Sequence, residues 1–211
     1  MQFLFKSLIQ AGVVLLLVTF FWSLHRLLAK LRKRDSEAWH VWLGLTKPPS
    51  VRLGLILFAV FFGVGAVLPA LAQWLIPGYE KIVKASPQFK IANGPLASLL
   101  VAAPAYAFVM TGFSEELLFR GVIGKRFIQW LGATPGNLAQ ALVFAALHVA
   151  IVYAAEPDPG VMLILFGGFL PGVMGWIFGW AMVRDRGSIF APWLAHSAGN
   201  LATVFAYLAV R

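Results

Sequence analysis

"VAAPAYAFVMTGFSEELLFRGVIG", residues 101–124, is an apolar run that nevertheless contains three side chains of charged type. About 20 such residues in a helix span the hydrocarbon core of a bilayer. A charge at that depth costs about 2.5 kcal/mol or more, so charged residues there usually face a protein interior or a water-filled cavity. The run therefore predicts a membrane helix that directs Glu115, Glu116 and Arg120 into a helix bundle.

The composition of the whole chain favours an integral membrane protein. Of the 211 residues, 60% are hydrophobic and only 12% are charged, whereas soluble domains carry about 25% charged residues. This apolar surplus is too large for one water-soluble core. We predict an all-α, polytopic membrane helix bundle that forms a single domain, residues 1–211.

Six apolar runs are long enough to cross a bilayer. They are residues 7–29, 52–76, 96–124, 136–154, 160–183 and 188–209. We therefore expect about six transmembrane helices around a polar cavity. The first run is too long for a secretory signal, lacks a small-residue cleavage site and precedes the strongest basic cluster, so we expect a retained helix. The turn-forming sequence GATPG, residues 132–136, separates two of the runs.

The net charge of +9 predicts the orientation of the bundle rather than a nucleic-acid partner. The basic residues flank apolar runs, as expected for topology and anionic lipid, and no nucleic-acid-reading motif is present. Six crossings place eleven lysines and arginines on one side of the membrane, in segments 26–52, 125–126 and 184–186. The other side has five: Lys6, Lys81, Lys84, Lys90 and Arg211. Cytoplasmic loops usually carry more lysine and arginine than external loops. We expect a cytoplasmic (inner or plasma) membrane protein with both termini outside.

Polar residues in three of the runs fall at a similar depth. Glu115, His148 and His196 lie eight to twelve residues from the expected cytoplasmic ends of their helices. At the helical rise this corresponds to about 12–18 Å. The three side chains can therefore meet at one level inside the bundle, somewhat inside the cytoplasmic face.

Spacing within each run suggests which side chains act together. Glu116 and Arg120 are four residues apart, so they can form an ion pair on one helix face. Glu115 lies about 100° away around that helix and can point into the bundle. His196 and Asn200 are also four residues apart and can reach the same point across a cavity.

This set of groups supports hydrolysis of an amide or ester. A carboxylate and an imidazole can share the deprotonation of a water molecule, and a second imidazole with a carboxamide can donate hydrogen bonds to an oxyanion. Phe144, one turn before His148, can form a wall of the site. Alternatively Glu115, His148 and His196 could hold zinc with an open position. We expect no cofactor and keep zinc as the alternative; the chain has no cysteine, which excludes thiolate ligands and cysteine nucleophiles.

A stripe of glycines marks the fifth run. Gly168, Gly172, Gly175 and Gly179 follow the small-xxx-small spacing that lets two membrane helices approach closely. We predict that this stripe packs against another helix of the bundle rather than forming a dimer face or a substrate groove.

Three segments together resemble a known family. EELLFR at 115–120, FAALH at 144–148 and HSAGN at 196–200 are similar to the EExxxR, FxxxH and HxxxN motifs of the CPBP family, the CAAX proteases and bacteriocin-processing enzymes, also called Abi. All three motifs are complete and in order. The resemblance covers a core of about 95–210.

The resemblance implies a type II CAAX prenyl endopeptidase-like enzyme with a water-accessible cavity and a glutamate-dependent mechanism. Carried over residue by residue, Glu115 and His148 would activate water, and His196 and Asn200 would form the oxyanion site. The supporting residues would be Glu116, Arg120 and Phe144. Relatives are often described as metalloproteases. The substrate would be a peptide or a membrane protein, with or without a lipid.

Two other functions are compatible with intramembrane polar residues. A non-catalytic membrane scaffold or bacteriocin self-immunity protein could keep the same polar core. A proton-coupled transporter also places acids and histidines inside the membrane. The sequence shows neither the internal repeat nor the paired broken helices typical of transporters. We therefore expect a membrane-embedded endopeptidase.

Overall fold

The computed structural model describes residues 2–209, and their regular secondary structure is entirely helical, as predicted. Several helices are long enough to cross a bilayer. They are α1 (Gln2–Leu31), α3 (Val51–Leu75), the long helix (Ser98–Leu131), α8 (Ala133–Ala155), the composite helix (Val161–Arg184) and α11 (Phe190–Ala209). The short helices between them are α2 (Trp39–Trp42), α4 (Tyr79–Ala85) and α5 (Pro87–Ala92).

Two of these helices contain π-helical stretches, in which hydrogen bonds join residues five apart. The long helix consists of η1 (Ser98–Ala102), η2 (Ala105–Phe113), α6 (Ser114–Glu116), η3 (Leu117–Gly124) and α7 (Lys125–Leu131). The composite helix consists of α9 (Val161–Ile164), η4 (Leu165–Phe169) and α10 (Leu170–Arg184). The two motif glutamates lie in α6, between two π-helical stretches. Such stretches occur frequently at functional sites.

Five of the six expected spans are both long and apolar enough to cross a membrane, and α11 is the exception. α11 is a continuous helix, but it lies inside the bundle, packed against α3 and η2. His196 and Ser197 on this helix are buried. Because neighbouring helices shield α11 from lipid, it can carry polar residues that a lipid-facing helix would not tolerate.

Local sequence explains where several helices begin. The Ser50 hydroxyl accepts a hydrogen bond from the Arg52 amide (3.1 Å) and caps α3. Ser86 caps α5 in the same way, followed by Pro87 in the first turn. Between the long helix and α8 only Gly132 is needed for the turn, with φ of 88°. α8 therefore begins at Ala133, three residues before the end of the turn segment expected from the sequence.

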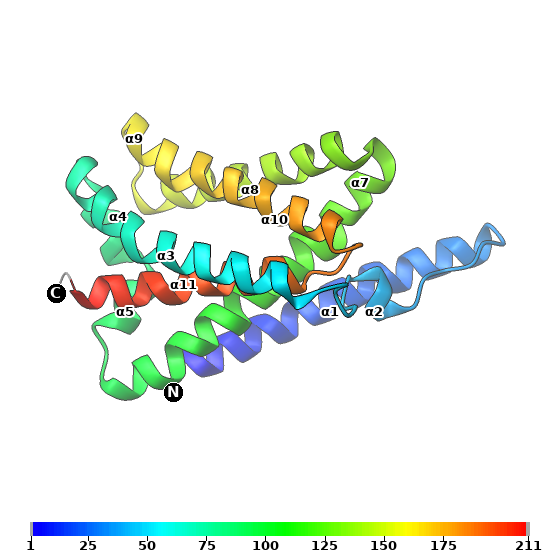
Figure 1. Ribbon diagram of the computed structural model, residues 1–211, viewed down its shortest axis with the longest axis horizontal. Helices are drawn as coiled ribbons and strands as arrows, with labels where there is room; N and C mark the ends of the chain where they lie inside the picture. Colours follow the sequence, from blue (N-terminus) through cyan, green and yellow to red (C-terminus); the bar gives the residue numbers. More distant parts are fainter. Residues whose placement is uncertain (1, 210–211) are drawn as a thin grey trace.

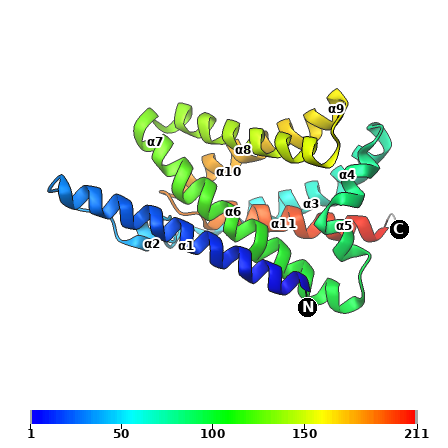
Figure 2. The same ribbon diagram turned by 180° about the vertical axis from the view of Figure 1, so that it is seen from behind.

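The helices form layers around α11. α3 packs along α11 on one side, and the long helix packs on another. α8 and α10 pair antiparallel above them, and the α1 and long-helix pair lies below (Figure 1). From behind, α1 runs along the outer face of the long helix (Figure 2). α4 and α5 lie together at the end of the bundle where α11 ends (Figure 1).

The glycine stripe packs against α8, which confirms the helix-packing prediction. A Cβ atom at Gly172 would lie 2.8 Å from the Cβ of Ala145. A Cβ at Gly175 would lie 3.2 Å from the Phe144 ring. At Gly179 it would overlap the side chain of Asn137. Side chains of α8 therefore reach the backbone of α10 only because these positions are glycines.

The basic segments of the chain lie at one end of the bundle. The end of α1, α2, α7 and the end of α10 are all at the right of Figure 1, and α4, α5 and the end of α11 are at the left. A chain that crosses the membrane six times places these basic segments on the same side, as the structure does. Arg211, one of the cations assigned to the opposite face, lies outside the described residues. Its long apolar helices make the chain an integral membrane protein. Which end of the bundle faces the cytoplasm stays a prediction.

Candidate active site

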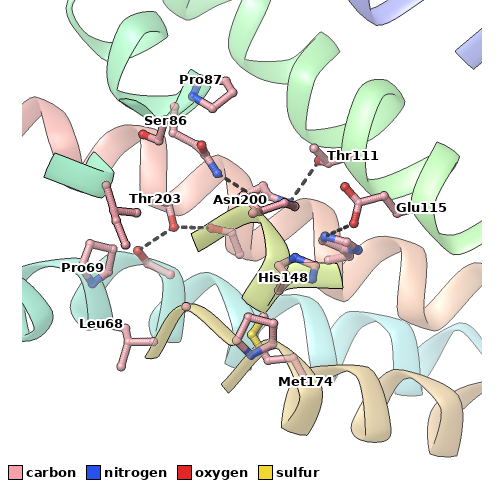
Figure 3. A pocket seen from close by; sticks show the side chains of 18 of the residues that line it. Leu68, Pro69, Ser86, Pro87, Thr111, Glu115, His148, Met174, Asn200 and Thr203 are labelled. Carbon is pink, nitrogen blue, oxygen red and sulfur yellow. Dashed lines mark hydrogen bonds and ion pairs between the residues drawn. The ribbon is translucent and has the colours of Figure 1, made fainter. Parts of the chain in front are cut away.

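A cavity of about 560 Å³ lies among the long helix, α3, α8, α10 and α11. Its lining includes every residue predicted to be catalytic: Glu115, His148, His196 and Asn200. Figure 3 shows Glu115, His148 and Asn200 directed toward the same space from three different helices. The structure thus brings together residues that lie up to 85 positions apart in the chain.

Glu116 and Arg120 form the expected ion pair, and both side chains are fully buried. Arg120 Nη1 donates to Glu116 Oε1 at 2.9 Å. The same oxygen lies 2.7 Å from Nδ1 of His196, on α11. Sequence reasoning assigned Glu116 only to the pair on its own helix. The contact with His196 depends on how α11 is placed against the long helix, which no spacing within one helix reveals.

Glu116 determines which nitrogen of His196 can face the cavity. An ionised carboxylate only accepts hydrogen bonds, so the Nδ1 atom of His196 must carry a proton. Nε2 is then the atom available for chemistry. It lies 3.8 Å from Oε2 of Glu115, which is too far for a hydrogen bond. Glu115 itself is partly exposed to the cavity, with 27% of its side chain accessible.

Phe144 separates Arg120 from the cavity, as the sequence suggested for a wall residue. The Arg120 guanidinium lies 4.6 Å from the centroid of the Phe144 ring and 5.1 Å from that of Phe178. Arg120 Nη2 also donates to the carbonyl oxygen of Gly175 at 3.3 Å. Aromatic faces and a carbonyl oxygen thus replace water around the buried cation.

His148 is oriented by the backbone of its own helix. Its Nδ1 atom lies 2.9 Å from the carbonyl oxygen of Phe144. A carbonyl oxygen only accepts, so Nδ1 carries the proton and Nε2 keeps a free lone pair. The His148 ring also packs against the Phe144 ring, with centroids 4.4 Å apart.

Two further residues hold Asn200 and were missed by sequence reasoning. Asn200 Nδ2 donates to the Thr111 hydroxyl at 3.1 Å (Figure 3). Gln88 Nε2 donates to Asn200 Oδ1 at 3.1 Å. Thr111 lies four residues before Glu115, and this spacing could have drawn attention to it. Gln88 comes from the polar segment between two membrane helices, where nothing in the sequence marks it.

The cavity extends from these residues toward α4 and α5. Its lining includes Tyr79, Ser86 and Gln88 at that end and no residue of the basic segments 31–50, 125–135 and 183–190. Burial raises the pKa of the Tyr79 phenol, so this side chain stays a neutral hydroxyl at physiological pH. Its oxygen lies 3.5 Å from that of Tyr207. The cavity therefore reaches the end of the bundle opposite the basic residues.

The alternative zinc site requires Glu115, His148 and His196 to direct donor atoms at one point. His196 directs Nδ1 at Glu116, and its Nε2 atom is 3.8 Å from Glu115. Among residues 2–209, no three histidine or carboxylate side chains converge as a metal site. Nδ1 of His148 faces the Phe144 carbonyl oxygen, and zinc binding stays the alternative prediction.

Comparison with known proteins identifies the family. A family model described as Type II CAAX prenyl endopeptidase Rce1-like matches residues 97–202, about half of the chain, and the match includes all three motifs. No curated protein and no solved structure matches the chain. The family match confirms the resemblance to the CAAX proteases. On these grounds the chain belongs to the Rce1-like family of type II CAAX prenyl endopeptidases.

Proposed function

We propose that this chain is an intramembrane endopeptidase that hydrolyses a peptide bond with a water molecule activated by Glu115 and His148. The observation that carries this proposal is the convergence of the four motif side chains on one cavity. Family membership supports a membrane endopeptidase at the level of the family. The roles that we propose for Glu115, His148, His196 and Asn200 extend that assignment to this chain.

Glu115 and His148 have the properties that water activation requires. Glu115 is the less buried of the two glutamates, and it has no hydrogen-bonded cation to satisfy it. The Nε2 lone pair of His148 is free because Nδ1 donates to the Phe144 carbonyl. A water between the two groups would give up its proton as its oxygen attacks the scissile carbonyl. The proton then passes to the amine as the carbon–nitrogen bond breaks.

His196 and Asn200 are suited to stabilise the negative charge that develops on the carbonyl oxygen. One N–H of Asn200 is engaged with Thr111, and the second remains free to donate. His196 can donate through Nε2 when it is protonated. The neighbouring Glu115, Glu116 and Arg120 together carry one net negative charge, so a protonated His196 would make the cluster neutral. Preorganised donors of this kind stabilise a tetrahedral intermediate without forming a covalent bond to the enzyme.

The substrate we propose is a peptide segment held at the membrane. The family name refers to prenylated proteins. Much of the cavity wall is apolar, including Val64, Leu68, Ile151 and Val152. Such a wall suits a lipid chain or an apolar segment beside the scissile bond. The lipid bilayer would present the substrate laterally, and we propose no metal cofactor.

The test is cleavage of a library of membrane-tethered peptides by the purified protein. The library contains farnesylated and unmodified C-terminal peptides. We expect the wild-type protein to cleave and Glu115→Gln, which keeps the size but removes the base, to lose activity by at least about a hundredfold. Chelation with 1,10-phenanthroline should leave cleavage unchanged.

Three results would contradict parts of this proposal. Equal cleavage by wild type and Glu115→Gln would exclude the glutamate mechanism. Loss of activity with chelator that added zinc restores would favour the metal alternative. Absence of cleavage of any peptide, together with partner binding that survives Glu115→Ala and His148→Ala, would favour the scaffold or self-immunity function.

A further inference from the structure

The amide of Asn200 is held from two sides by residues outside the three motifs. Gln88 Nε2 donates to its Oδ1 atom, and its Nδ2 atom donates to the Thr111 hydroxyl, each at 3.1 Å. The Thr111 hydroxyl in turn donates to the carbonyl oxygen of Tyr106 at 3.0 Å. Gln88 lies before the segment that the family model matches, so it is a feature of this chain beyond the motif pattern.

The direction of these bonds fixes which way the Asn200 amide points. The Tyr106 carbonyl can only accept, so the single hydroxyl proton of Thr111 is directed at it. The Thr111 oxygen must then accept from Asn200, which places Nδ2 on the Thr111 side. Oδ1 of Asn200 is left facing Gln88 and needs a donor there. Gln88 supplies that donor.

The backbone around Gln88 is anchored. Ser86 caps the first turn of α5. Ile91 and Ala92 on the same helix are fully buried and pack in a core cluster with Tyr106 and Tyr207. Gln88 is therefore presented to α11 from a fixed position, although α5 is only six residues long.

We propose that Gln88 is a positioning residue that orients Asn200 so that its free N–H faces the developing oxyanion. The role rests on the proposed function. If the amide of Asn200 turned over, its oxygen would face the cavity and repel the negative charge of the intermediate. Gln88 holds the productive orientation because it donates to Oδ1 and leaves the N–H groups on the other side.

The test uses steady-state kinetics on the best peptide from the library. Gln88→Ala should lower kcat about tenfold with little change in KM, because the orientation matters only when the oxyanion forms. Gln88→Glu has the same shape but replaces the donor by an acceptor, so it should lower kcat further. Lys90→Ala, on the exposed side of α5, is the matched control and should leave both constants unchanged.

A double-mutant cycle separates positioning from a general effect on the fold. Asn200→Ala should lower kcat by about a hundredfold, as expected for removal of an oxyanion donor. Adding Gln88→Ala to Asn200→Ala should have no further effect if Gln88 acts through Asn200. Independent, multiplying losses would overturn the proposal. An unchanged kcat in Gln88→Ala would overturn it as well.

The contact can also be tested without turnover, because the chain contains no cysteine. The double variant Gln88→Cys/Asn200→Cys should form a cross-link with the shortest bifunctional methanethiosulfonate reagents, and Lys90→Cys/Asn200→Cys should not. Failure of the first pair to cross-link would overturn the contact even if the wild type cleaves peptides. Cross-linking in a protein whose wild type cleaves nothing would contradict the proposed function, and the positioning role would fail with it.

Discussion

Glu116 has more partners than its spacing suggests. It binds Arg120 on its own helix and His196 on α11, while its neighbour Glu115 faces the cavity. Adjacent residues on a helix point about 100° apart. The two glutamates of one motif therefore occupy different environments: Glu116 is enclosed by its partners, and Glu115 is open to the cavity.

Because of this difference, we predict that substitution of Glu116 mainly lowers stability and that substitution of Glu115 mainly lowers activity. Glu116→Ala leaves Arg120 buried without a counter-ion, which should destabilise the protein by about 3–5 kcal/mol. Glu115→Gln removes only a partly exposed carboxylate and should change stability little, although we expect it to abolish cleavage. Thermal unfolding of both variants in detergent measures the effect. Equal unfolding temperatures for the two variants would show that Glu116 is not the structural carboxylate of the pair.

At the scale of elements, the crossing of α3 and α11 positions half of the site. α11 carries His196 and Asn200, and Gly199 between them approaches Gly65 of α3. A Cβ at Gly65 would lie 2.9 Å from the Cα atom of Gly199 and closer still to its carbonyl oxygen. Backbone atoms of two packed helices cannot move aside as a flexible side chain can. The position of α11 therefore depends on the absence of a side chain at residue 65.

We predict that Gly65→Ala displaces α11 and lowers both stability and activity. Overpacking of this kind costs about 1–3 kcal/mol, and a shift of about 1 Å at the site can reduce turnover a hundredfold. Gly63→Ala is the matched control, because a Cβ there would meet no atom within 4 Å. Thermal unfolding and kcat are measured for both variants. If Gly65→Ala matches Gly63→Ala in both, the close crossing does not position the site.

At the scale of the whole molecule, the cavity and the basic residues lie toward opposite ends. The cavity lining comes from α4, α5 and the adjoining parts of the long helices. The basic segments lie at the end formed by α2 and α7. If the basic end faces the cytoplasm, as we propose from the charge distribution, the cavity extends toward the outer face of the membrane.

Accessibility of single cysteines tests this orientation directly in a chain that contains none. Asp35 and Asp158 are both exposed and lie in connecting segments at opposite ends. In intact cells, a membrane-impermeant maleimide should label Asp158→Cys and not Asp35→Cys, and permeabilised cells should label both. The reverse pattern would mean that the basic end faces outward and that the cavity extends toward the cytoplasm.

The sequence alone determined the class of the fold and the residues of the motifs. Apolar runs of bilayer length predict membrane helices because backbone polar groups must be satisfied within each helix. The i, i+4 pair of Glu116 with Arg120 followed from helical spacing, and the packing role of the Gly168–Gly179 stripe followed from its small residues. Each of these is a local property, so neighbouring residues are enough to reveal it.

The contacts between helices were decided only by the tertiary structure. Glu116 with His196, Gln88 with Asn200, and Gly65 against Gly199 all join residues more than 75 positions apart in the chain. Their pairing depends on how one helix is rotated and shifted along another. A periodic sequence pattern indicates which face of a helix is buried, but not which residue of the neighbouring helix lies opposite each position. The sequence predicted residues 188–209 as a membrane-spanning run, but not that this helix lies inside the bundle. Its polar residues are shielded from lipid because α3 and the long helix pack against it.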